Sequence, residues 1–377
     1  MGFADLSGLP YPWDTIGPYV DRARSHPDGI VDLSIGTPVD PTPDVVRDAL
    51  AGAGDAHGYP TTHGTPALRD AIAAWFARRR GVAIDADDVL PTVGSKELVG
   101  LLPSLLRLGA GDVVVHPDVA YPTYDVGARL AGATPLPVAG VEDWAGRADV
   151  RLVWVNSPSN PTGAVADVET LRRTVEAARE IGAVVVSDEC YAELPWAERW
   201  VADGVPSLLD PRVCGGSHAG LLVAYSLSKQ SSVAGYRAAF VAGDQDLVRD
   251  LLATRKHLGM IVPGPVQAAM TAALADDEHV AAQRRTYGRR RERLLDAVLG
   301  AGYVVEHSEA GLYLWVRAAD GVQKDCWDLV GEWADRGILV GPGEFYGAAG
   351  ARHVRVSLTA SDERVDAACD RLRTAPR

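Results

Sequence analysis

Short apolar runs alternate along the chain with segments whose apolar residues recur at helical spacing. The runs are continuous, as in strands buried on both faces, and cover residues 112–116, 150–155, 183–187 and 221–225. Thr65 and Pro66 are typical of a helix N-cap and first helical position, and an apolar stripe at helical spacing extends from Leu68 to Phe76. The alternation predicts an α/β fold whose mostly parallel sheet is covered by helices on both faces.

The pattern changes in the last third of the chain. A long helical stretch covers about 265–299. The strand and helix patterns that follow it lie at 311–316, 353–358 and 362–372. We therefore predict a large α/β domain at 45–275, and a small α+β domain made of 276–377 together with an N-terminal arm at 1–44.

Composition and charge narrow the class of protein. Of the 377 residues, 47% are apolar and 23% are charged, which is enough to bury a sizeable core. The net charge of −13 argues against nucleic acid and membrane surfaces as partners. No apolar run is long enough for a bilayer and no signal peptide is visible, so we expect a cytoplasmic protein. The four cysteines form no CxxC pair, which predicts reduced thiols.

The first candidate for chemistry is a lysine after the run 221–225. Ser226, Ser228 and Lys229 follow this run, and Arg237 comes eight positions after the lysine. A lysine at a strand end can form a Schiff base when burial and nearby cations lower its pKa. The hydroxyls and the guanidinium are groups that bind phosphate. A surface lysine on a loop explains the same residues equally well.

Two other runs lead into polar side chains. Asp188 directly follows the run 183–187, and Asn160 lies in a turn with two prolines and a glycine after the run 150–155. Because α/β sheets bind ligands at the carboxyl ends of their strands, Asp188 could pair with a protonated ring nitrogen. A helix cap or a metal ligand is the alternative, and metal is the weaker one because no His or Cys has ligand spacing. For Asn160 the alternative is an ordinary turn.

Gly94 and Ser95 precede a predicted helix at 98–106. A glycine followed by a hydroxyl residue at a helix N-terminus offers free N–H groups to an anion. The segment is not a Walker A loop, because the first glycine of that motif is missing.

Together and in this order, these motifs resemble the class I/II pyridoxal-phosphate aminotransferases of the fold-type I group. The resemblance covers nearly the whole chain and rests on Gly94, Ser95, Lys96, Tyr121, Asn160, Asp188, Tyr191, Lys229, Arg237 and Arg355. It implies the fold-type I architecture, which is a large domain with a mostly parallel sheet between helices plus a smaller α+β domain. It also implies pyridoxal 5'-phosphate as cofactor, amino acids and 2-oxo acids as substrates, and no metal.

The resemblance implies a role for each motif residue at the cofactor. Lys229 forms the Schiff base, Asp188 pairs with the pyridine nitrogen, and Asn160 and Tyr191 contact the ring hydroxyl. Lys229, Asp188 and Tyr191 are thereby the implied catalytic residues. Tyr121 is expected to stack on the ring, with Tyr124 as the fallback. The residues expected around the phosphate are Gly94, Ser95, Lys96, Ser226, Ser228 and Arg237.

The resemblance also implies how substrate and a second subunit are bound. Arg355 is expected to clamp the substrate α-carboxylate, with Asn160 beside it and the backbone at Gly36 on its other side. A planar guanidinium matches a carboxylate with two parallel hydrogen bonds. Tyr59 is expected to reach the phosphate of a neighbouring subunit, which implies a homodimer with shared active sites.

Further motifs resemble the actinobacterial N-succinyl-L,L-diaminopimelate aminotransferases. They cover residues 11–15, 27–33, 36–41, 94–98, 121–127, 255–263 and 343–347. The implied reaction moves an amino group from N-succinyl-L,L-diaminopimelate to 2-oxoglutarate, in lysine and diaminopimelate biosynthesis. Lys96 is then a candidate for binding a distal acid group, and simple solvent exposure is its alternative.

Three other functions stay open at this point. The same family includes aminotransferases with another amino donor in a specialised pathway, and β-lyases with the same cofactor. Substrate choice within one fold rests on a few pocket side chains that a sequence does not place. A transcription-factor effector domain of this fold is disfavoured, because we expect no room for a DNA-binding extension.

Overall fold

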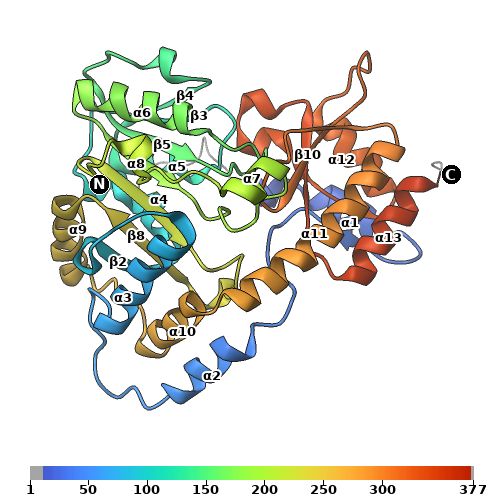
Figure 1. The fold of residues 1–377 in the computed structure, drawn as a ribbon. Helices are drawn as coiled ribbons and strands as arrows, with labels where there is room; N and C mark the ends of the chain where they lie inside the picture. The colour runs from blue at the N-terminus through green and yellow to red at the C-terminus, as the bar shows by residue number, and fades with distance from the viewer. Residues whose placement is uncertain (1–11, 375–377) are drawn as a thin grey trace, which may run out of the picture.

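The computed structural model describes residues 12–374 (Figure 1). Tyr11 of the motif at 11–15, and the first part of the predicted arm at 1–44, lie outside the described residues.

A seven-stranded sheet forms the centre of the larger part of the molecule. Its strands lie in the order β2-β8-β7-β6-β5-β3-β4. They are β2 (Val89–Val93), β3 (Val113–Pro117), β4 (Thr134–Val138), β5 (Val150–Asn156), β6 (Val184–Asp188), β7 (Leu221–Ser226) and β8 (Ala238–Gly243). The five strands from β7 to β4 pair in parallel, whereas β8 is antiparallel to both β7 and β2. The prediction of a mostly parallel α/β sheet is confirmed.

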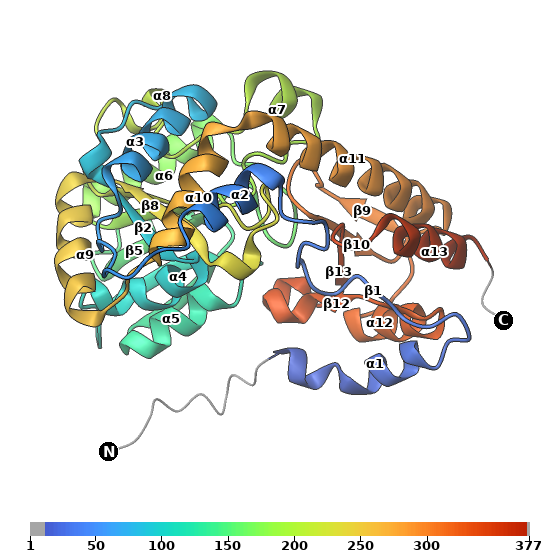
Figure 2. The same cartoon turned by 90° about the horizontal axis from the view of Figure 1, so that it is seen from below.

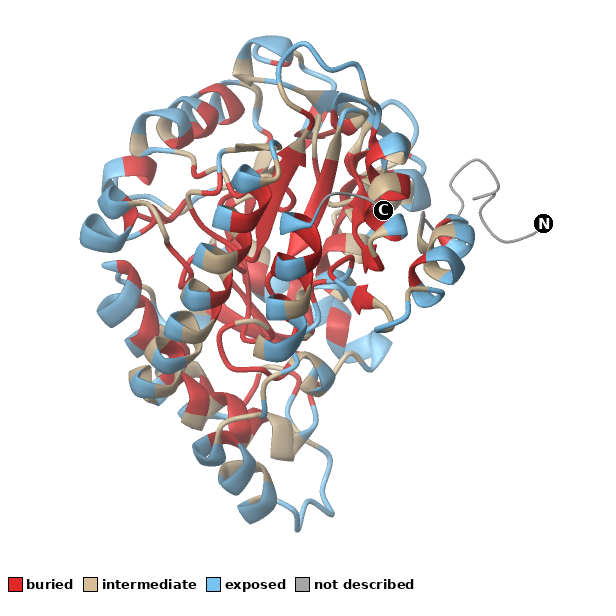
Figure 3. Cartoon of the chain, turned by 90° about the vertical axis from the view of Figure 1, so that its right-hand side faces the viewer, coloured by how far each residue is buried: buried red, intermediate tan, exposed pale blue. Residues whose placement is uncertain are grey.

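Helices bury both faces of this sheet, so its strands other than the edge strand β4 are buried along most of their length (Figure 3). Val153, Val185 and Val223 point into one core cluster, which also contains side chains of α3 and α6. Their neighbours along the strands, including Trp154 and Val186, point into a second cluster with α4, α5 and α9. Burial on both faces explains why these strands are continuous apolar runs rather than alternating ones.

The helices of this part surround the sheet (Figures 1 and 2). They are α2 (Asp44–Gly52), α3 (Pro66–Trp75), α4 (Ser95–Leu105), α5 (Thr123–Ala131), α6 (Val168–Ile181), α7 (Glu198–Asp203), α8 (Pro211–Cys214), α9 (Gln245–Leu258) and α10 (Gly264–Ala275). The Thr65 hydroxyl accepts a hydrogen bond from the Leu68 amide, as expected of the N-cap of α3. Within residues 12–374, no helix has the length and apolar character needed to span a membrane.

A smaller antiparallel sheet lies beside the first, in the strand order β12-β13-β10-β9. Its strands are β9 (Val304–Glu306), β10 (Tyr313–Arg317), β12 (Gly341–Pro342) and β13 (His353–Ser357). A separate parallel pair joins β1 (Val31–Asp32) to β11 (Ile338–Leu339). The helices around these strands are α1 (Gly17–Arg24), α11 (Asp277–Gly300), α12 (Cys326–Asp335) and α13 (Asp362–Arg373). The domain boundary near residue 275 stays a prediction.

The prediction of one continuous helix at 265–299 is wrong. It is two helices, α10 and α11, because Asp276 has extended dihedral angles (φ −113°, ψ 110°). Its carboxylate accepts a hydrogen bond from the Glu278 amide and caps α11. The sequence pattern at 265–299 does not indicate this break, because an acidic residue is as typical of a helix surface as of a helix start. The strands β2 and β4 were also missed, since the prolines inside them read as breaks and both strands lie at sheet edges.

A buried ion pair fixes the chain where β6 ends. The carboxylate of Glu189 accepts hydrogen bonds from Arg80 (2.8 Å), the Ser207 hydroxyl (3.1 Å) and the Leu208 amide (2.8 Å). The side chains of Arg80 and Glu189 are 2% and 1% exposed. Because Glu189 directly follows Asp188, this pair fixes the backbone beside the predicted site.

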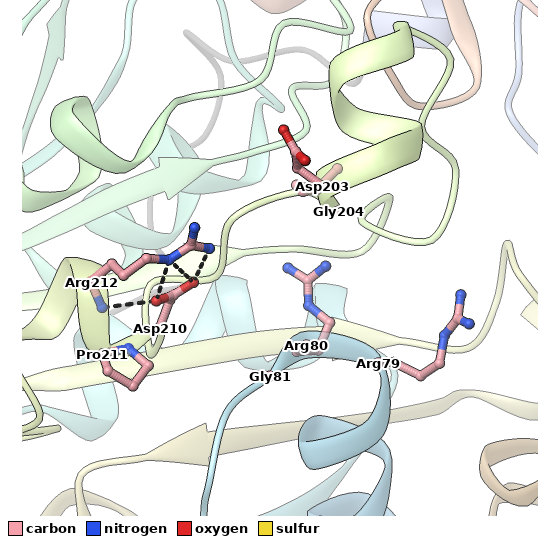
Figure 4. Close-up of a pocket in the computed structure, with 9 residues that line it drawn as sticks. Arg79, Arg80, Gly81, Asp203, Gly204, Asp210, Pro211 and Arg212 are labelled. Atoms are coloured by element: carbon pink, nitrogen blue, oxygen red, sulfur yellow. Dashed lines mark hydrogen bonds and ion pairs between the residues drawn. The ribbon is translucent and has the colours of Figure 1, made fainter.

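Arg80 also lines a surface pocket of about 370 Å³ with Arg79 and Arg212 (Figure 4). Each of these arginines is already bonded to a carboxylate: Arg79 to Glu193, Arg80 to Glu189, and Arg212 to Asp210. The pocket therefore has matched charges.

We predict that Arg80→Leu lowers the free energy of unfolding by about 3–5 kcal/mol, because it leaves Glu189 buried without its cation. Denaturant titration measures this loss. The control is the double variant Arg80→Leu/Glu189→Leu, which removes both charges and should lose clearly less. An equal loss in the single and double variants would contradict this account.

Candidate active site

Most predicted site residues converge where the parallel strands of the large sheet end. Asp188 is the last residue of β6, Lys229 follows β7, and Asn160 lies in the loop after β5. The N-terminus of α4 comes from the loop after β2, and Arg355 reaches the same place from β13 of the small sheet. The site therefore lies between the two sheets, at the carboxyl edge of the larger one.

The guanidinium of Arg355 joins three segments. Its Nη1 donates a hydrogen bond to Asn160 Oδ1 (2.9 Å), and its Nη2 donates to the Ser34 carbonyl oxygen (2.7 Å). Arg355 is 4% exposed. Among the described residues, no carboxylate forms an ion pair with it. The geometry thus holds a buried cation that is available to a carboxylate ligand.

Lys229 lies close to this cation. Its Nζ donates a hydrogen bond to the Gly36 carbonyl oxygen. Burial lowers the pKa of Lys229, and the positive charge of Arg355 acts in the same direction. A larger fraction of neutral amine is therefore available than on an exposed lysine, which suits a nucleophile or a base.

Asp188 is buried with neutral partners. Its carboxylate accepts hydrogen bonds from the Tyr124 hydroxyl (3.0 Å) and the Cys190 amide (3.2 Å). Burial raises the pKa of Asp188, although hydrogen bonds from Cys190 and Tyr124 oppose this rise. In the described part of the chain Asp188 has no ion-pair partner, so its charge is left for a cation from outside the chain.

An anion cradle lies at the start of α4. Gly94 has a positive φ of 78°, and a Cβ at this position would collide with the guanidinium of Arg237. Ser95 begins the helix, so its first amides are free to bind an anion. Ser226 donates a hydrogen bond to the hydroxyl of Ser228 (2.7 Å) on the strand end that leads to Lys229.

The two candidate stacking tyrosines differ in their contacts. Tyr121 is partly exposed, its ring lies 6.0 Å from that of Tyr124 at 85°, and Lys96 Nζ is 5.8 Å from its centroid. The ring of Tyr124 is buried and stacks on Trp154 at 5.0 Å. Tyr124, the fallback for stacking on the cofactor, is thus a hydrogen-bond donor to Asp188 within the core instead.

One predicted residue is not brought to the others. Tyr59 is 100% exposed, although the remaining residues of the predicted site are clustered. The role expected for it involves a second subunit.

Three aromatic residues at the site were missed from the sequence. The ring centroids of Tyr313, Tyr346 and Trp13 lie 4.0, 4.8 and 5.8 Å from the Arg355 guanidinium carbon. The Tyr313 hydroxyl is 3.3 Å from that of Tyr191. Burial acts to raise the pKa of Tyr313, but the charges of Arg355 and Lys229 outweigh it and the pKa is lowered. The glycine-rich loop at 341–350 was a usable signal for Tyr346, whereas Tyr313 reads as an ordinary strand residue.

These features fit the cofactor that the resemblance implies. Pyridoxal phosphate carries a phosphate, an aldehyde and a ring nitrogen that can be protonated. The cradle at Gly94 and Arg237, the amine of Lys229 and the unpaired carboxylate of Asp188 match these three groups. No group of three or more His, Cys, Asp or Glu residues within 12–374 could hold a metal ion.

The family model and the similar proteins that the comparisons found are all aminotransferases. The family model described as aminotransferase class I and II matches residues 28–372. The chain is 55% identical to the 4-dedimethylamino-4-oxo-anhydrotetracycline transaminase OxyQ of Streptomyces rimosus, over 96% of this chain and 98% of OxyQ. It is 54% identical to the probable aminotransferase Rv1178 of Mycobacterium tuberculosis, over 96% of this chain and 84% of that protein.

More distant likenesses concern diaminopimelate enzymes. The chain is 31% identical to an LL-diaminopimelate aminotransferase of Dehalococcoides mccartyi, over 95% of this chain and 94% of that protein. A solved structure of a probable N-succinyldiaminopimelate aminotransferase from Thermus thermophilus has a TM-score of 0.84 at 27% identity, covering 96% of this chain and 99% of that one.

We predict that the amine of Lys229 titrates below the value of about 10.4 that is usual for a free lysine, because burial disfavours its protonated form. Cofactor-free protein is acetylated at a series of pH values, and the extent at each lysine is read by mass spectrometry. The exposed Lys256 is the internal control for reagent and pH. A midpoint for Lys229 at or above that of a free lysine would show that the site does not lower its pKa.

Proposed function

This chain belongs to the class I and II aminotransferase family, and we propose that it transfers the amino group of N-succinyl-L,L-diaminopimelate to 2-oxoglutarate. The family is dependent on pyridoxal phosphate. The observation that carries the transamination is the buried guanidinium of Arg355 beside Lys229, because amino donors and oxo acids alike present a carboxylate next to the reacting carbon. The motif resemblance and the solved structure named for N-succinyldiaminopimelate support this donor, and the LL-diaminopimelate relative supports a diaminopimelate substrate.

Each residue near the cofactor has a proposed task. When bound, pyridoxal phosphate supplies an electron sink for the bonds at the substrate Cα. Lys229 would hold it covalently, and its freed amine would move the proton at Cα. Asp188 would keep the ring nitrogen protonated, Asn160 and Tyr191 would contact the ring hydroxyl, and Tyr121 would stack on the ring. The phosphate would lie against Gly94, Ser95, Lys96, Ser226, Ser228 and Arg237.

The substrate carboxylate would be bound between two segments. Arg355 would supply two parallel N–H donors, and Asn160 fixes its orientation through the 2.9 Å hydrogen bond. Gly36 would present its backbone on the other side, where a Cβ would collide with the Tyr313 ring. Holding the carboxylate in this way orients Cα toward Lys229. Lys96, which is exposed, is the proposed partner for a distal acid group.

A homodimer with shared active sites is part of the same proposal. Tyr59 would reach the phosphate of the partner, and its complete exposure in the single chain leaves it free to do so. Ile35, Val39 and Val45 are also exposed apolar residues of this N-terminal segment. A dimer would bury such residues.

A second donor–acceptor pair is favoured by one specific finding. The identity of 55% to OxyQ extends over nearly all of both chains. In this alternative the acceptor is a ketone on a polycyclic aromatic substrate, of the kind that the name of OxyQ describes. The rings of Tyr313, Tyr346 and Trp13 would then contribute apolar surface beside Arg355.

We predict that holoenzyme mixed with N-succinyl-L,L-diaminopimelate, without an oxo acid, converts stoichiometrically from the pyridoxal to the pyridoxamine form. Absorbance spectra follow the conversion, and Lys229→Ala is the inactive control because it lacks the amine that moves the proton. If the spectrum persists with this donor and converts with glutamate, the diaminopimelate proposal is wrong and the second candidate is tested next.

We also predict that mixing two impaired variants restores activity. A heterodimer of Lys229→Ala with Tyr59→Ala contains one site in which Lys229 of one chain meets Tyr59 of the other. After subunit exchange, turnover should exceed the sum of the two separate variants. Each variant exchanged with itself is the control. No gain on mixing, or a fully active monomer in sedimentation, would contradict the shared site.

A further inference from the structure

Tyr346 and Arg355 present two buried polar atoms without partners. Both residues are 4% exposed. The hydroxyl of Tyr346 and the Nε–H of Arg355 have no hydrogen-bond partner within residues 12–374. A buried donor that stays unpaired costs free energy, so a ligand that accepts hydrogen bonds at this place would remove that cost.

Tyr346 differs in this respect from the other buried tyrosines in the described part of the chain. The hydroxyls of Tyr191 and Tyr313 pair with each other. Those of Tyr124, Tyr225 and Tyr287 have partners in Asp188, Gln230 and the Lys229 carbonyl oxygen. Core packing alone therefore does not leave tyrosine hydroxyls unpaired in this protein.

The ring of Tyr346 lies against the buried cation, and its hydroxyl lies near a carbonyl oxygen that the cation contacts. The Tyr346 ring centroid is 4.8 Å from the Arg355 guanidinium carbon. A Cβ placed on Gly341 would be 3.6 Å from the Tyr346 hydroxyl and 3.5 Å from the Ser34 carbonyl oxygen, which Arg355 already contacts. Gly341 is paired with Arg355 across β12 and β13. The absent side chain at Gly341 thus leaves a gap of about one methyl group, bounded by the Ser34 carbonyl oxygen, the Trp13 ring and the Tyr346 hydroxyl, next to the residue proposed to bind the carboxylate.

We propose that the Tyr346 hydroxyl donates a hydrogen bond to the substrate carboxylate that Arg355 binds, and so acts as a substrate-binding residue. This inference rests on the proposed role of Arg355 as the carboxylate clamp. Burial raises the pKa of Tyr346, so its hydroxyl keeps the proton that it donates at neutral pH. The guanidinium of Arg355 donates hydrogen bonds in one plane, and the Tyr346 hydroxyl adds a donor from another direction. This third hydrogen bond restricts how the carboxylate is oriented.

The test is the binding of glutarate, a dicarboxylate that has no amino or keto group and so cannot react. Tyr346→Phe holoenzyme should bind glutarate roughly ten-fold more weakly than the native holoenzyme by calorimetry, because a hydrogen bond to a charged group is lost. Its thermal midpoint without glutarate should be unchanged or higher, because the variant removes an unpaired buried hydroxyl. A purely structural role would lower that midpoint instead.

Tyr303→Phe is the matched control. It makes the same chemical change at a hydroxyl bonded 3.5 Å away to Glu332, and glutarate binding should not change. Native glutarate affinity in Tyr346→Phe would overturn the proposal, as would a lower midpoint with unchanged affinity. Weakened glutarate binding in a protein that does not use N-succinyl-L,L-diaminopimelate would uphold the role of Tyr346 while rejecting the donor.

Discussion

The architecture of the site depends on one buried cation. Arg355 comes from the small sheet, and its hydrogen bonds reach the loop after β5 of the large sheet and the N-terminal segment at Ser34. A buried guanidinium without a carboxylate is costly, and here amide and carbonyl oxygens and aromatic ring faces offset part of that cost. The rest is recovered only when a carboxylate binds. The residue that joins the two sheets at this point is therefore also the one proposed to bind the substrate carboxylate.

The same principle governs the other ionisable groups of the site. Asp188 and Lys229 have neutral hydrogen-bond partners. Burial raises the pKa of Asp188 and lowers that of Lys229, so in both it favours the neutral form. Groups held in this way are fixed before a ligand arrives, which is what electrostatic preorganisation requires. The basic residues Lys229, Arg355 and Arg237 gather here although the whole chain carries a net charge of −13. Local placement, rather than net charge, thus suits the site to phosphate and carboxylate ligands.

Site residues that come at or just after the end of a strand could be predicted from the sequence. Asp188 and Lys229 could be placed at one sheet edge, because continuous apolar runs predict parallel strands whose carboxyl ends meet. Tyr346 could not be singled out, because a tyrosine in a turn gives no sign of whether its hydroxyl finds a partner in the fold. The break at Asp276 was missed because an acidic residue is compatible with a helix surface and with a helix start, and the edge strand β4 was missed because its prolines are as typical of a loop as of a sheet edge.

Specificity has to come from residues beyond the clamp. In its proposed role Arg355 would bind a carboxylate that amino donors and oxo acids share, so it would raise affinity for many substrates without choosing among them. Discrimination between substrates requires residues that contact the part in which the substrates differ, which is the end far from this carboxylate. Lys96 is the residue proposed above for that end, and the ring of Trp13 beside Arg355 comes from the N-terminal segment rather than from either sheet. Such a segment can vary while the sheets stay fixed. One scaffold can therefore resemble both a diaminopimelate aminotransferase and a transaminase of a polycyclic ketone while keeping the same chemistry.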